Sequence, residues 1–163
     1  PRRMPRSHFF GLFLLYAART SENFLFLDPV NLVVHEAGHP LFGLFGYIIG
    51  ILGGTLLELI VPFALLVYFW WCRHTSGVAF CALWFFENFL YIGTYMADAR
   101  RLSLPLVGSG DHDWEILFSY WRVLHLDQKI GGATRTLGWW GMVLTVLWLI
   151  WMGRRTAASR VQS

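Results

Sequence analysis

Long blocks of apolar residues, separated by short polar stretches, dominate the chain. A helix that crosses a bilayer needs about 20 predominantly apolar residues. Blocks that approach or exceed this length cover residues 24–49, 52–71, 78–97 and 137–152. A shorter block at residues 9–18 suits an interfacial helix better. The pattern predicts an all-α, polytopic integral membrane bundle of about four spans plus interfacial helices, forming a single domain over residues 1–163.

The longest connection in this bundle covers residues 98–136. It starts with a loop-like stretch that contains Pro105, Gly108 and Gly110. From Asp111 to about Leu126 the apolar residues roughly follow a helical period. We therefore expect an amphipathic helix between the third and fourth spans.

Composition and charge support a membrane rather than an aqueous environment. The chain is 56% hydrophobic and 14% charged, whereas soluble domains are about 25% charged. The net charge is +3, with arginines gathered at the two ends, at positions 2, 3, 6, 154, 155 and 160. Arginines beside apolar blocks indicate contact with anionic membrane lipids, not nucleic acid. Four spans would place both ends on one side, so we expect a bacterial inner-membrane protein with both termini cytoplasmic.

The candidate chemistry lies in the segment His35-Glu36-Ala37-Gly38-His39, inside the first predicted span. Helical residues four apart differ by about 400° and roughly 6 Å, so both imidazoles share one face and can bind one zinc ion. Glu36 is offset by about 100° and can reach a water on that metal. Zinc lowers the pKa of such a water toward about 7, and the glutamate can take its proton. The alternative is a buried polar cluster that joins helices without metal.

A third protein ligand is needed, and four residues that follow the third span are candidates: His112, Asp113, Asp111 and Asp98. We favour His112, because residues 111–113 form the most ligand-rich cluster. Two of the acids have structural alternatives: Asp113 can cap a helix that begins near Trp114, and Asp98 can pair with Arg100 or Arg101. Acids that do not bind the metal can orient the histidines through hydrogen bonds.

Three further polar or helix-breaking residues bear on this site. Glu58 and Glu87 lie inside the second and third predicted spans, where each can act as a ligand or as an interhelical hydrogen-bonding group. Pro40 follows His39 directly and removes the helical hydrogen bond to the carbonyl of Glu36. We therefore expect a kink at the site.

Asp28 and Pro29 suit a helix start, with the aspartate as the cap.

The H-E-x-x-H segment on a membrane-embedded helix resembles the site-two-protease class of intramembrane zinc metalloproteases. The resemblance covers residues 33–46 and implies His35 and His39 as zinc ligands and Glu36 as catalytic base. In that class an aspartate near a later membrane helix, usually followed by glycine, is the third ligand. Asp98 matches it in position only, since Ala99 follows. Four later stretches are similar to uncharacterised bacterial membrane proteins often labelled putative metallopeptidases: 53–55, 97–100, 104–106 and 111–114.

The expected function is that of a zinc-dependent, membrane-embedded hydrolase, foremost a metalloprotease acting on a peptide substrate in or near the bilayer. One alternative is a zinc-dependent lipid amide or ester hydrolase, whose cavity would take an acyl chain. A second is a di-iron oxidase built on Glu36 and His39, although a second E-x-x-H segment is missing. A third is a non-enzymatic metal-binding or assembly protein, in which Glu36→Gln would leave function intact.

Overall fold

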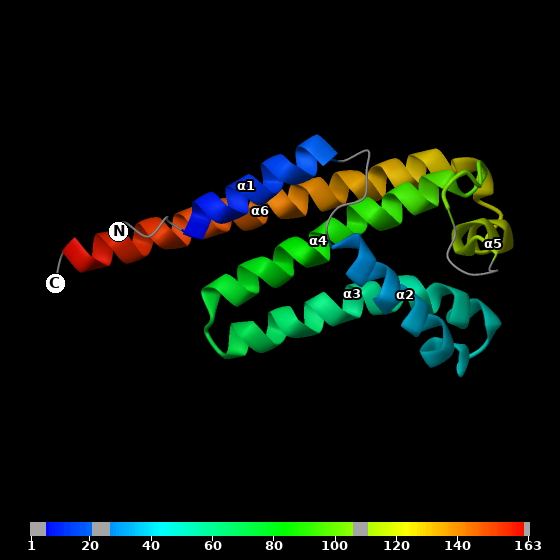
Figure 1. The fold of residues 1–163 in the computed structure, drawn as a ribbon, viewed down its shortest axis with the longest axis horizontal. Helices are drawn as coiled ribbons and strands as arrows, with labels where there is room; N and C mark the ends of the chain where they lie inside the picture. Colours follow the sequence, from blue (N-terminus) through cyan, green and yellow to red (C-terminus); the bar gives the residue numbers. More distant parts are fainter. Residues whose placement is uncertain (1–5, 21–26, 106–110, 162–163) are drawn as a thin grey trace.

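The computed structural model describes residues 6–20, 27–105 and 111–161, and all regular structure in these segments is helical. In chain order the elements are α1 (Arg6–Thr20), α2 (Asp28–Gly43), α3 (Tyr47–Trp71), α4 (Thr75–Asp98), α5 (Asp113–Tyr120), the 3₁₀ turn η1 (Leu124–Leu126) and α6 (Asp127–Val161). Figure 1 shows α3, α4 and α6 as long, roughly parallel rods, with α2 crossing α3 and α5 at one end of the bundle. The predicted all-α class is confirmed.

By length and composition, three of the described helical segments can cross a membrane: Tyr47–Trp71, Thr75–Asp98 and Leu124–Arg155. They contain the predicted spans 52–71, 78–97 and 137–152. Large apolar side chains stay exposed on α3 and α6, among them Phe63, Trp70, Trp140 and Trp151. Exposed apolar surface of this extent is unusual on a monomer in water and suits contact with lipid.

The predicted continuous helix at 24–49 is wrong at its C-terminal end. α2 stops at Gly43 and the chain turns before α3 begins at Tyr47. Gly46 lies in this turn with φ of 115°, a conformation that favours glycine and cannot continue a helix. Pro40 lies inside α2, which continues past it to Gly43. α2 is therefore a 16-residue helix beside α3.

An apolar core joins α4, α6 and α1. Buried side chains from the three helices form one cluster: Ala17, Ala79, Leu83, Leu90, Met142, Val146 and Leu149. α1 lies along α6 in Figure 1, and the core cluster includes its Ala17 together with the partly buried Phe13 and Leu14. The block at residues 9–18 thus packs on the bundle as part of a 15-residue helix.

The connection from α4 to α6 is shorter than predicted, because α6 already begins at Asp127. The Arg100 guanidinium lies 2.6 Å from the buried Asp127 carboxylate and fixes the start of α6 beside the end of α4. The amphipathic helix expected from Asp111 to about Leu126 is divided into α5 and η1, with Arg122 at φ 60° between them. α5 packs through Trp114, Leu117 and Phe118, all buried.

Candidate metal centre

His35 and His39 lie on one face of α2, as their spacing predicts. Their ring centroids are 4.8 Å apart and the two rings meet edge to face. His35 is buried, and the side chain of His39 is 28% exposed. The buried face of α2 also carries Asp28, Asn31 and Gly38. The helix thus turns a polar stripe inward, and both imidazoles belong to it.

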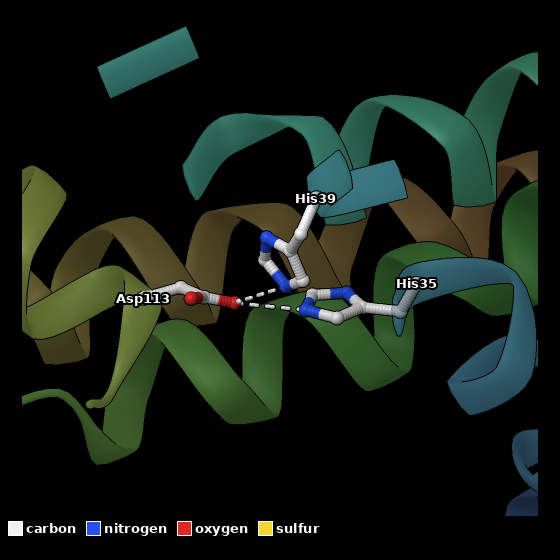
Figure 2. Close-up of side chains that lie close together, drawn as sticks. All are labelled: His35, His39 and Asp113. Carbon is white, nitrogen blue, oxygen red and sulfur yellow. Dashed lines mark hydrogen bonds and ion pairs between the residues drawn. The ribbon is translucent and has the colours of Figure 1, made fainter. Parts of the chain in front are cut away.

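Asp113 meets the two histidines from the other side (Figure 2). Its Oδ2 lies 2.8 Å from Nε2 of His35 and 3.5 Å from Nε2 of His39. One ligand atom from each of these three side chains lies within 4.8 Å of the others. Asp113 is the first residue of α5, and its backbone N–H donates to the Tyr95 hydroxyl on α4 at 3.2 Å. Residues 78 positions apart are thereby brought into one cluster.

The far nitrogen of each imidazole also has a partner. Nδ1 of His39 lies 3.0 Å from the carbonyl oxygen of Gly50, and Nδ1 of His35 lies 3.2 Å from Oε2 of Glu58. A carbonyl oxygen can only accept, so Nδ1 of His39 carries the proton. In neutral His39 the Nε2 lone pair then faces a carboxylate oxygen of Asp113. A proton on Nε2 or a metal cation between the two acceptors would relieve this contact.

His35 lies between two carboxylates that favour a positive charge at this position. Burial lowers the pKa of His35, but hydrogen bonds to the carboxylates of Asp113 and Glu58 outweigh it and raise the pKa to about 9. An imidazole held between two acids therefore favours a cationic state. A metal ion on Nε2 satisfies the same two carboxylates, and metal-bound histidines usually donate their other N–H to an acid or a carbonyl.

The donor set fits zinc. Two imidazole nitrogens and one carboxylate oxygen are ligands that zinc accepts, and three protein ligands leave a position open, as in catalytic zinc sites. The same two-histidine, one-carboxylate set also occurs with non-haem iron, so the ligands alone do not name the metal. Of the residues that the structure describes, only His35, His39 and Asp113 form a cluster of this type.

His112, the favoured third ligand from the sequence, lies outside this cluster. It is the N-cap of α5, and its Nδ1 accepts the backbone N–H of Glu115 at 3.2 Å. Its Nε2 lies 3.6 Å from Oδ2 of Asp98, and its ring centroid lies 4.2 Å from that of Tyr95, with the two ring planes tilted by 43°. Burial lowers the pKa of His112, although the nearby Asp98 opposes this. His112 therefore caps α5, the role considered for Asp113, and Asp113 lies beside the two histidines, the place expected for His112.

The two remaining candidates are also placed away from the histidines. Asp98 accepts hydrogen bonds from the backbone of Ser103 and Leu104 and from the Ser103 hydroxyl, so it holds the turn after α4 instead of pairing with an arginine. Asp111 is exposed and lies two residues before Asp113. Neither is a member of the three-residue cluster.

The structure also places three other acids to which the sequence analysis gave a role: Glu36, Glu87 and Asp28. Glu36 is exposed on α2 and lies close enough to Tyr95 for an electrostatic interaction. The Tyr95 hydroxyl in turn accepts the backbone N–H of Asp113. Glu87 accepts a hydrogen bond from Asn31 at 3.2 Å and joins α4 to α2. Asp28 is the first helical residue of α2, and Leu27 is the N-cap without a side-chain hydrogen bond, so the predicted aspartate cap is wrong.

Comparison with known proteins adds no family to this description. No protein-family model, no curated protein and no solved structure matches the chain.

Proposed function

We propose that this chain is a membrane-embedded, zinc-dependent hydrolase that cleaves a peptide bond, with His35, His39 and Asp113 as the metal ligands. The observation that carries the proposal is the convergence of two imidazole Nε2 atoms on one carboxylate oxygen, with Nδ1 of His39 committed to a carbonyl. Three helices of membrane-spanning length and apolar exposed surfaces support a location in the bilayer.

Glu36 is assigned as the general base. It follows His35 directly, so its side chain leaves α2 about 100° from that of the ligand. When bound, zinc supplies Lewis acidity toward water and the substrate carbonyl. The Glu36 carboxylate takes a proton from the attacking water and returns it to the leaving amine, which general acid–base catalysis by a positioned side chain requires. Its exposure on α2 leaves it accessible to a substrate.

The substrate must present an extended segment at this site. A helical peptide holds its carbonyls in hydrogen bonds, so a membrane helix has to unwind locally before one of them can be attacked. The exposed face of α2 that carries Glu36 also holds Val33, Ala37 and Leu41. An apolar face beside the base suits a substrate that comes from the bilayer rather than from water.

Metal analysis of the purified protein in detergent tests the site. Wild type and His112→Asn should hold one zinc per chain, because asparagine is itself a good N-cap and His112 is not a ligand. His35→Ala and Asp113→Asn should lose it. Iron in place of zinc would move the proposal to oxygen chemistry, and zinc retained in His35→Ala would remove the site altogether.

Turnover tests the reaction. Glu36→Gln should keep its zinc and lose about 10²–10⁴-fold in rate, the usual contribution of a general base. Suitable probes are a quenched fluorescent peptide with a transmembrane segment, and an N-acyl amide lipid, each reconstituted with the protein. Cleavage of the lipid alone would favour the lipid hydrolase. Equal activity of Glu36→Gln and wild type on either probe would contradict base catalysis by Glu36.

A further inference from the structure

One face of α3 carries a repeated spacing that matches the histidines of α2. Gly50, Gly54, Glu58 and Pro62 follow one another at intervals of four residues, and all four are buried. Helical residues four apart lie one above the other on the same face. This stripe, which we call the α3 support stripe, faces α2, as the contacts of its members with His35 and His39 demonstrate.

Each of the first three members of the stripe acts on an imidazole. The carbonyl of Gly50 accepts from Nδ1 of His39. A Cβ atom at Gly54 would lie 2.6 Å from Nε2 of His35, so only glycine leaves room for that ring. The carboxylate of Glu58 meets Nδ1 of His35 at 3.2 Å. Both histidines are therefore located by α3 as well as by their own helix.

Pro62 explains how Glu58 is itself held. Proline has no N–H, so the carbonyl of Glu58, four residues earlier, receives no helical hydrogen bond. The side-chain amide of Asn88 on α4 donates to that carbonyl instead. Glu58 and Asn88 are 1% and 0% exposed. The carbonyl that Pro62 leaves without a helical hydrogen bond thus connects α3 to α4 at Glu58, the residue that contacts His35.

The hydrogen bond to His35 accounts for the buried carboxylate of Glu58. Its Oε2 faces His35, and its Oε1 has no hydrogen-bond partner in the part of the chain that the structure describes. Placing a carboxylate in an apolar interior is costly, and a residue serving only to fill space would be apolar. Glu58 is thus explained by the metal site.

We propose that Glu58 is a positioning residue of the metal centre: it holds the Nδ1 proton of His35, so that Nε2 presents its lone pair to the metal. This inference rests on the proposed metal site and adds the partner that tunes it. The signature G-x-x-x-G-x-x-x-E-x-x-x-P on the helix after H-E-x-x-H is its sequence counterpart.

The test compares Glu58→Gln with Glu87→Gln. Both changes neutralise a buried acid in the same bundle, but Glu87 hydrogen-bonds Asn31 rather than a histidine. Zinc affinity is measured by competition with a chromophoric chelator, and the ligand geometry by the visible spectrum of the cobalt-substituted protein. Glu58→Gln should bind zinc about 10–100-fold more weakly, the usual cost of losing a hydrogen-bond partner of a metal ligand, and should alter the cobalt spectrum. Glu87→Gln should match wild type in both.

Two milder variants keep the test decisive if Glu58→Gln yields no folded protein. Glu58→Asp retains the charge and should recover part of the affinity. Asn88→Leu leaves the carboxylate in place but frees the Glu58 carbonyl, so it should weaken zinc binding in the same direction by a smaller factor. Equal zinc affinity in all Glu58 and Asn88 variants and wild type would overturn the positioning role. Failure of wild type to bind any divalent metal would instead overturn the proposed function.

Discussion

Two helix pairs in this bundle use glycine to approach closely, yet they fill the space differently. Where α4 meets α6, a Cβ atom at Gly93 would meet the carbonyl of Gly131 and one at Gly131 would meet that of Gly93, and the buried cluster that joins the two helices is apolar. Where α2 meets α3, Gly38 contacts the backbone of Gly53 and Gly54. There the freed space receives the ring of His35. Close packing serves as a scaffold in the first pair and surrounds the candidate metal centre in the second.

The difference lies in which atoms the second pair buries. The α4–α6 core consists of side chains such as Leu83, Met142 and Leu149, which need no partners. The inner face of α2 buries Asp28, Asn31 and His35. Every such polar group needs a hydrogen bond or a charge partner, because burial without one costs free energy. The α2–α3 pair is thus specified by polar contacts as well as by shape, and small changes there should affect binding before they affect folding.

Gly54→Ala should give the largest effect on the metal centre. The added methyl group would lie 2.6 Å from Cε1 and Nε2 of His35, so the ring has to leave its position. Since loss of a partner to a ligand alone costs 10–100-fold in affinity, displacement of the ligand should cost at least about 100-fold. Isothermal titration or chelator competition with zinc measures it.

Gly43→Ala is the matched control, because a Cβ there meets nothing within 4 Å. It lies in the same helix pair and should bind zinc like wild type. A Gly54→Ala protein that is folded and binds zinc with unchanged affinity would contradict the geometry of His35.

Gly141→Ala, at the contact between α4 and α6, should lower the stability of the fold and leave zinc affinity unchanged. Its added methyl group would collide with the ring of Phe86 on α4. Overpacking of this kind costs about 1–3 kcal/mol in the free energy of unfolding. Thermal unfolding in detergent should therefore shift to lower temperature, while the folded protein keeps its zinc affinity. Gly153→Ala, with open space at the Cβ, should change neither quantity. Loss of zinc in folded Gly141→Ala would show that scaffold and site are coupled.

The same contrast explains how far the sequence could predict the structure. Apolar length predicts α3 and α4 well, since both depend on composition over 20 or more residues. The spacing of His35 and His39 predicts a shared face, because helical geometry is local. The end of α2 depends on one backbone angle at Gly46, which apolar content does not report. The support from α3 depends on the register between two helices, which neither helix encodes alone.

Which of the candidate residues joins the two histidines could not be decided from the sequence, for a related reason. His112 and Asp113 are neighbours, and either type of side chain can bind a metal or cap a helix. The choice depends on where α5 begins. That start is set by contacts with α4, namely Asp98 beside His112 and Tyr95 at the backbone of Asp113. Residues 14 or more positions earlier therefore decide which of two adjacent side chains faces the histidines.

Tyr95→Phe tests this last dependence and should give the smallest effect. It removes the hydroxyl that accepts the N–H of Asp113, and leaves the ring contact with His112 intact. A single hydrogen bond contributes about 0.5–1.5 kcal/mol, so zinc affinity should fall by roughly 2–12-fold, far less than in Gly54→Ala. Tyr120→Phe removes an exposed hydroxyl from α5 and should have no effect. Unchanged affinity in Tyr95→Phe would mean that α5 is held at the site without α4, whereas a loss as large as in Gly54→Ala would make Tyr95 part of the metal centre itself.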